Sequence, residues 1–160
     1  GQDFYKRIME KLKDRDVKII VDTSGKALKD SLGLKPYLIK PNLRELEGIF
    51  NLKIKDKKDL SSYSKKLQER GARNIIVSLG KEGAYMICEN GEEYFCQAPE
   101  GRLVDSVGSG DSMVAGFVYA KDKGLSNEEA FKFSIASGSA TAFSENLGTK
   151  EEIYSLYEKM

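Results

Sequence analysis

The stretch VDSVGSGDSMVAG, residues 104–116, joins a glycine-rich turn to an apolar helix and places one carboxylate at the junction. Gly108, Ser109 and Gly110 let the backbone approach a ligand, because glycines carry no Cβ. The helix that starts there presents unpaired N–H groups, which favour an anion. Asp111 would repel phosphate, so its position makes sense if it accepts a proton from an alcohol that attacks phosphorus. The alternative, an acidic start to an ordinary helix, stays open on the pattern alone.

The composition is that of an ordinary globular chain. The 160 residues suit one domain, 40% are hydrophobic and 32% are charged, and the net charge is +1. No basic field indicates nucleic acid, no apolar run approaches the ~20 residues of a membrane span, and no signal peptide opens the chain. We therefore expect a cytoplasmic protein with neither nucleic acid nor membrane as a partner.

The sequence contains no histidine and only two cysteines, Cys88 and Cys96. Histidine-based triads and the usual zinc sites are therefore excluded. A hairpin turn at Asn90-Gly91 would not place the two thiols opposite each other, so we expect no disulfide. Carboxylates, lysines, hydroxyls, backbone amides and an oxygen-bound cation remain as the available chemistry.

Hydrophobic patterns predict strands that alternate with helices. The expected strands are 17–22, 37–42 and 74–80, followed by a hairpin around Asn90-Gly91; the expected helices are 2–14, one between Ser24 as N-cap and Gly33, about 43–50, 57–70, 110–123, 127–144, and a short one from about 150. This order predicts an α/β fold with a mainly parallel sheet covered by helices. Three parallel strands are few for such a sheet, which suggests that the chain is part of a larger protein.

Asn42 and Glu45, in KPNLRE, follow the second expected strand. Their spacing predicts a capping box at the start of a helix. The alternative is functional, because ligands of open α/β sheets bind at the carboxyl ends of strands and Mg²⁺ there keeps its waters. Glu45 could then hold Mg²⁺ through water.

Two further stretches have both a structural and a functional interpretation. In SLGKEGA, residues 78–84, Gly80 and Gly83 suit either a turn between strands or a loop along the phosphates of a nucleotide, with Ser78 as a contact. In SIASGSATAFS, residues 134–144, the small side chains suit close helix packing, a slot for a purine ring, or both.

Taken together and in their order along the chain, KPNLRE, VSLGKEGA and VDSVGSGDSMVAG resemble the C-terminal half of ribokinase-like carbohydrate kinases of the phosphofructokinase B type. The resemblance covers nearly the whole chain. Within the family, VDTSGKAL, LIKPN and GSATAFSENLGT are most similar to the 1-phosphofructokinase branch, with tagatose-6-phosphate kinases as near relatives. It implies a three-layer α/β/α sandwich and transfer of phosphate from ATP to a sugar phosphate, fructose 1-phosphate yielding fructose 1,6-bisphosphate.

The resemblance also implies residue roles. Asp111 would be the catalytic base, and Gly108, Ser109, Gly110 and the Asp111 amide would form the anion hole. The other implied positions surround the nucleotide or cations: Lys40, Asn42, Ser78, Gly80, Lys81, Gly83, Ala142 and Asn146 for ATP, Glu45 for Mg²⁺ through water, and Asp105 for K⁺.

Family members are about twice as long as this chain. We therefore expect residues 1–160 to be a single C-terminal nucleotide-binding and catalytic portion, without the N-terminal half that carries the lid and the sugar site. Alone it should be inactive, and its open sheet edge could support a homodimer or other self-association. Two alternatives stay open: a family kinase acting on another alcohol, such as tagatose 6-phosphate, a nucleoside or a vitamin, and a nucleotide-binding module without catalysis.

Overall fold

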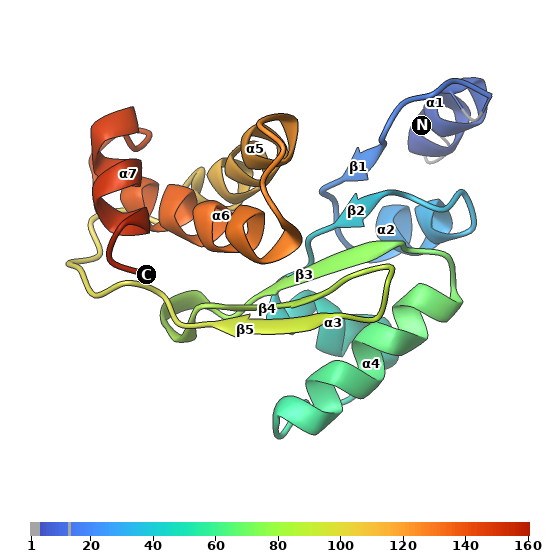
Figure 1. Cartoon of the computed structure of the whole chain (residues 1–160). Helices are drawn as coiled ribbons and strands as arrows, with labels where there is room; N and C mark the ends of the chain where they lie inside the picture. Colours follow the sequence, from blue (N-terminus) through green and yellow to red (C-terminus); the bar gives the residue numbers. More distant parts are fainter. Residues whose placement is uncertain (1–3, 13) are drawn as a thin grey trace. The chain divides into compact units, whose positions relative to one another are not determined.

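The computed structural model describes residues 4–12 and 14–160. The chain divides into two compact units: Gly1–Ser78 with Tyr85–Glu93, and Leu79–Ala84 with Tyr94–Met160. The ends of the expected first helix at residues 2, 3 and 13 lie outside the described residues. Five strands form one sheet in the order β1-β2-β3-β4-β5 (Figure 1): β1 (Ile20–Val21), β2 (Leu38–Ile39), β3 (Asn74–Ser78), β4 (Ala84–Ile87) and β5 (Glu93–Cys96).

The first unit contains the parallel strands β1, β2 and β3 and four helices. The helices are α1 (Phe4–Leu12), α2 (Gly25–Leu32), α3 (Leu43–Phe50) and α4 (Lys57–Glu69). Ile20 pairs with Leu38 and Val21 with Ile39, while Ile39 pairs with Ile75. Leu38, Ile39 and Ile75 are fully buried, and α3 and α4 both contact β3. The parallel register brings the carboxyl ends of these strands to one edge, as the sequence predicts.

Two strands and one helix cap differ from expectation. β1 and β2 each contain two residues, although the apolar runs predicted strands over 17–22 and 37–42. A strand extends only as far as its residues pair with a neighbouring strand. Val17 lies outside the paired residues of β1, and its side chain is 50% exposed. Ser24 is the N-cap of α2, but its side chain accepts no capping hydrogen bond.

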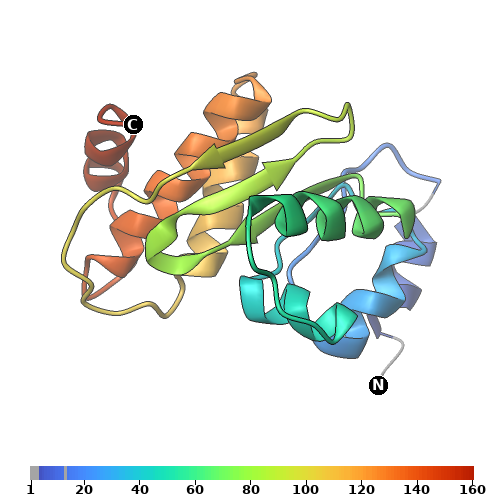
Figure 2. The same ribbon diagram turned by 90° about the horizontal axis from the view of Figure 1, so that it is seen from below.

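The second unit contains a short 3₁₀ turn, η1 (Gly80–Glu82), and three helices: α5 (Ser109–Asp122), α6 (Asn127–Ala142) and α7 (Lys150–Tyr157). Figures 1 and 2 show α5 and α6 side by side, in amber and orange, and their packing is the most extensive between any two elements of this unit. A Cβ at Gly116 would collide with Ser137, and one at Gly138 would collide with Met113. The interpretation of SIASGSATAFS as a close-packing surface is therefore confirmed at Gly138.

Local signals in the sequence are matched at several helix starts. Ser126 with Glu129 and Thr149 with Glu152 form capping boxes at the starts of α6 and α7. Cys88 and Cys96 form no disulfide, as expected. In residues 4–12 and 14–160 there is no helix with both the length and the apolar character needed to cross a membrane.

Candidate functional site

The predicted site residues of the first unit gather at the carboxyl edge of its parallel strands. Lys40 directly follows β2, and Ser78 is the last residue of β3. Asn42 forms a parallel bridge with Ser78, and the Ser78 amide donates to the Pro41 carbonyl at 3.1 Å. The edge of an open α/β sheet at which strands end is where such folds bind ligands.

Asn42 and Glu45 form the capping box of α3. The Glu45 amide donates to Asn42 Oδ1 at 2.9 Å, and the Asn42 amide donates to Glu45 Oε2 at 2.9 Å. The structural interpretation of KPNLRE is thus confirmed. The capping bond occupies one carboxylate oxygen of Glu45, and the other oxygen could accept a hydrogen bond from a metal-bound water.

Lys40 is buried next to a carboxylate that the sequence analysis did not select. Its Nζ lies 3.3 Å from Asp22 Oδ2, and the two side chains are 8% and 30% exposed. Asp22 directly follows β1, so the pairing of Val21 with Ile39 places Asp22 beside Lys40. The parallel register was the missing information, because single strands do not show which strand-end residues are neighbours.

The second unit contains the start of α5, where Gly108 is the N-cap. Gly108 has φ +77°, the left-handed region, and no side chain caps the helix. Within the described chain, the amides of Gly110 and Asp111 donate to no protein acceptor, whereas the Ser109 amide donates to the Ser106 carbonyl at 3.2 Å. Asp111 is exposed in the first helical turn. Two unpaired amides and an exposed carboxylate therefore meet at one helix end, as the sequence predicts.

The remaining groups around this helix start anchor it to α6. Ser109 Oγ donates to the Gly138 carbonyl at 2.9 Å, so the hydroxyl is engaged with the protein. Asp105 Oδ1 accepts from the Val107 amide at 2.9 Å, and the Asp105 amide donates to the Ala142 carbonyl at 3.2 Å. These hydrogen bonds hold the segment around Gly108 against the C-terminal end of α6.

Thr141 joins the first turn of α5 to the loop that precedes α7, and within the stretch 134–144 the sequence did not single it out. Its Oγ1 lies 2.8 Å from Ser112 Oγ and accepts from the Gly148 amide at 3.0 Å. Thr141 is buried, and Ala142 beside it is half-buried. A buried hydroxyl near the end of a helix of small residues was the available signal, but many such hydroxyls serve only packing.

The glycine loop at Gly80–Gly83 is a tight turn in the same unit. The Leu79 amide donates to the Gly83 carbonyl at 2.9 Å, and the Gly83 amide donates to the Gly80 carbonyl at 3.0 Å. Gly83 is buried with φ +95°, while Gly80 and Lys81 are exposed. The turn interpretation is confirmed, and the exposed backbone stays available for a ligand.

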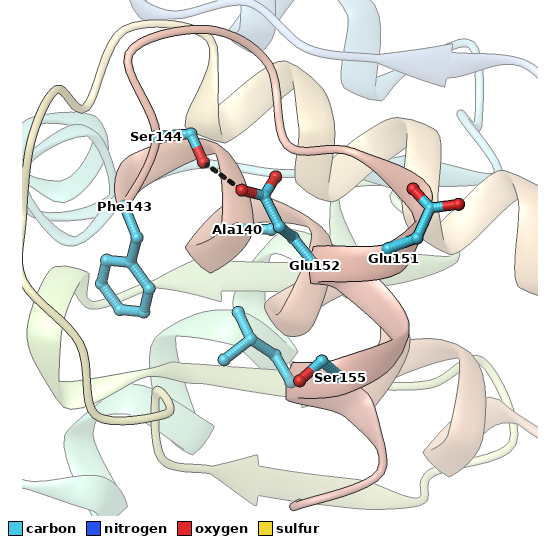
Figure 3. A pocket seen from close by; sticks show the side chains of 7 residues that line it. Ala140, Phe143, Ser144, Glu151, Glu152 and Ser155 are labelled. Carbon is cyan, nitrogen blue, oxygen red and sulfur yellow. Dashed lines mark hydrogen bonds between the residues drawn. The ribbon is translucent and has the colours of Figure 1, made fainter.

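A pocket of about 370 Å³ lies between the end of α6 and α7, and part of its lining comes from the stretch 134–144, for which a purine slot was one interpretation. Its lining consists of Ala140, Phe143, Ser144, Glu151, Glu152, Ser155 and Leu156 (Figure 3). Glu152 accepts from the Thr149 amide and hydroxyl, which holds the pKa of that carboxyl below its usual range. An ionised Glu152 beside Glu151 would repel phosphate, so this pocket does not suit the charged part of a nucleotide. Asn146 is exposed in the loop that precedes α7.

The described part of the chain contains no group of three or more histidine, cysteine, aspartate or glutamate residues that could hold a metal ion. The two carboxylates predicted to bind cations lie in different units, Glu45 in the first and Asp105 in the second. Such isolated oxygens suit the outer coordination of a hydrated Mg²⁺, which usually retains several waters and takes phosphate oxygens as ligands.

Three comparisons place these features among known proteins. The 1-phosphofructokinase of Bacillus subtilis (strain 168) is 45% identical over 154 residues, 96% of this chain and 50% of that protein. The structure of Escherichia coli phosphofructokinase-2 in complex with potassium matches with a TM-score of 0.91 and 26% identity, over 99% of this chain and 52% of the other. Arabidopsis thaliana ribokinase, complexed with ribose and ATP, has a TM-score of 0.84 and 20% identity, over 99% of this chain and 53% of the other.

These matches confirm the expected ribokinase-like α/β fold. The chain spans about half the length of the curated relatives it matches. Residues 2–153 match the family described as pfkB family carbohydrate kinase. Because that match extends over nearly the whole sequence, the chain belongs to the pfkB family of carbohydrate kinases.

Proposed function

We propose that this chain forms the nucleotide-binding and catalytic side of an ATP-dependent sugar-phosphate kinase that converts fructose 1-phosphate to fructose 1,6-bisphosphate. The observation that carries the proposal is the start of α5, where the Gly110 and Asp111 amides have no protein acceptor and the Asp111 carboxylate is exposed. The similarity to 1-phosphofructokinase supports the choice of substrate. Since its relatives are twice as long, we propose that the chain alone does not transfer phosphate.

In this proposal Asp111 is the catalytic base. Its carboxylate takes the proton of the sugar hydroxyl as the hydroxyl oxygen forms a bond to the γ-phosphorus. The bond from that phosphorus to the oxygen of the β-phosphate breaks, and ADP leaves with the electron pair. The Gly110 and Asp111 amides donate to the transferring group, where preorganised donors have their largest effect. Gly108 has no side chain that could block the transferring group from these amides. The Ser109 hydroxyl holds the loop in place by donating a hydrogen bond to the Gly138 carbonyl.

The remaining predicted positions are proposed to hold ATP and its cations. Lys40, Asn42 and Ser78 in the first unit and Gly80, Lys81, Gly83, Ala142 and Asn146 in the second would contact the nucleotide. Mg²⁺, when bound with ATP, would offset the charge of the phosphates, with Glu45 holding one of its waters. K⁺ is proposed near Asp105, on the precedent of the potassium complex of phosphofructokinase-2. We also propose a cytoplasmic location and self-association along β1, which is an edge strand because it stands first in the sheet order.

The first test is calorimetric titration of Mg-ATP into the chain and two variants. We expect weak binding to the wild type and, for Gly108→Val, a loss of affinity of at least about tenfold, because a β-branched residue is strained at φ +77° and would meet Leu147. Asp111→Asn should bind at least as tightly as the wild type, since it has lost a charge that repels phosphate.

The matched control is Gly124→Val, which has φ +80° at the other end of α5 and open space around its Cβ. It should keep the wild-type affinity despite similar backbone strain. A folded wild-type chain that binds no Mg-ATP contradicts the proposed nucleotide site. Loss of binding in Asp111→Asn would instead assign Asp111 to a metal or to the structure.

Glu45→Gln separates the capping role of Glu45 from its proposed role at Mg²⁺. Glutamine can still accept from the Asn42 amide, so the melting temperature should change by less than about 2 °C. The lost charge should lower the affinity for Mg-ATP about threefold while leaving metal-free ATP unaffected. Equal affinities of the variant and the wild type for Mg-ATP, measured by the same titration, would leave Glu45 with the capping role alone.

A further inference from the structure

Lys40 differs from the other ion-paired lysines of the described chain in its burial. Its side chain is 8% exposed, whereas those of Lys26 and Lys53 in their ion pairs are 67% and 83% exposed. Removing an ammonium from water is strongly unfavourable unless nearby charges and hydrogen bonds compensate for the lost hydration. A buried lysine at the end of β2 is therefore unfavourable for folding unless its charge has a further role.

The compensation that the protein itself gives Lys40 is incomplete. Among residues 4–12 and 14–160, Asp22 is its one charged partner, at 3.3 Å. That distance is longer than the 2.7–2.9 Å expected of a strong charge-assisted hydrogen bond. A lysine ammonium has three donors, so at least two remain for a ligand or water. The position at the carboxyl edge of β1 and β2 is also the position where such a sheet receives ligands.

We infer that Asp22 is a positioning residue, which holds the Lys40 ammonium at the carboxyl edge of β1 and β2 so that its remaining donors meet the phosphates of a bound nucleotide. This inference rests on the proposed function. The parallel register fixes the two strand ends beside each other, and the short Asp22 side chain limits where the long lysine side chain can extend. Without that carboxylate, the flexible stem of Lys40 would sample other directions, and the charge would meet the phosphates less often.

The sign of the effect on affinity distinguishes positioning from simple electrostatics. A carboxylate near a phosphate site repels the ligand, so removing it should tighten binding if Asp22 acts only through space. If Asp22 acts through Lys40, removing it should weaken binding. Asp22→Asn is therefore informative in either direction, and Asp22→Glu restores the charge on a side chain one methylene longer.

The test is a double-mutant cycle with Mg-ATP, measured by calorimetry on the 160-residue chain. We expect Asp22→Asn to lower the affinity about fivefold, Asp22→Glu to regain most of it, and Lys40→Met to lower it about tenfold. In the Lys40→Met background, Asp22→Asn should cause no further loss. Asp30→Asn is the matched control, since it removes a carboxylate 2.9 Å from the exposed Lys26 and should not change the affinity.

A second measurement reports on the pair without nucleotide. Acetylation of Lys40, followed by mass spectrometry, should be several-fold faster in Asp22→Asn than in the wild type, because the ammonium is no longer held at the strand end. Equal acetylation rates, or Asp22→Asn binding Mg-ATP as tightly as the wild type, would overturn the inference alone. A folded wild-type chain that binds no Mg-ATP would overturn the proposed nucleotide site, and the assignment of Asp22 to it would fall with it.

Discussion

Gly83→Ala is expected to destabilise the folded chain by about 3 kcal/mol or more, the sum of backbone strain and overpacking. Gly83 has φ +95° and ψ −129°, a region that is essentially closed to other residues. Its added Cβ would also collide with the carbonyl oxygen of Cys96 and with backbone atoms of Gln97 and Ala98. A side chain in the way could rotate aside, but these are main-chain atoms. Urea denaturation followed by circular dichroism measures the loss.

Gly80→Ala is the control in the same loop. Gly80 also has a positive φ, +62°, but no atom lies within 4 Å of its added Cβ. The expected cost is about 1 kcal/mol, that of a left-handed residue alone. If the two substitutions destabilised the chain equally, the collision with the main chain of residues 96–98 would not contribute.

Gly138→Leu is expected to cost about 3 kcal/mol, because it inserts a side chain into the closest approach of α5 and α6. The added Cβ would collide with Met113 and would lie 3.0 Å from the Ser109 carbonyl oxygen. The Gly138 carbonyl also accepts the Ser109 hydroxyl, so displaced helices would disturb the start of α5. Thermal denaturation followed at 222 nm would detect the loss.

The matched substitution is Gly48→Leu in α3. Gly48 is exposed and has open space around its added Cβ, so a better helix former should stabilise the chain by up to about 1 kcal/mol. The same chemical change is thus expected to have opposite signs in two helices. Equal effects at the two positions would mean that α5 and α6 can separate enough to admit leucine.

Helix boundaries were predictable where the sequence carries local capping signals. The helix expected at about 43–50 is found at Leu43–Phe50, because Asn42 and Glu45 cap its start and Asn51 adopts a left-handed conformation at its end. Strand lengths were predicted less well, since each strand residue needs a partner from elsewhere in the chain. The run from Val17 is apolar, but only Ile20 and Val21 find partners on β2.

The candidate site shows the same division between local and non-local information. The glycine-rich start of α5 and the capping box of α3 are contiguous in sequence, so motifs located them. Asp22 and Thr141 escaped notice because their contacts, Lys40 and Gly148, depend on strand register and on how a loop returns to its helix. The roles of Asp111 and Glu45 with substrates are chemical hypotheses that the titrations will decide.

The order in which the chain visits its two units has a consequence for engineering. The polypeptide leaves the first unit after Ser78, returns to it at Tyr85 and leaves it again after Glu93. Neither unit is therefore one continuous segment, and a cut between Glu93 and Tyr94 would strand Leu79–Ala84 on the wrong piece. Two-fragment reporters split at that point should require both halves to reassemble the second unit, because residues 94–160 lack Leu79–Ala84. A gene redesigned to express the two units as separate polypeptides would have to place residues 79–84 on the same polypeptide as residues 94–160.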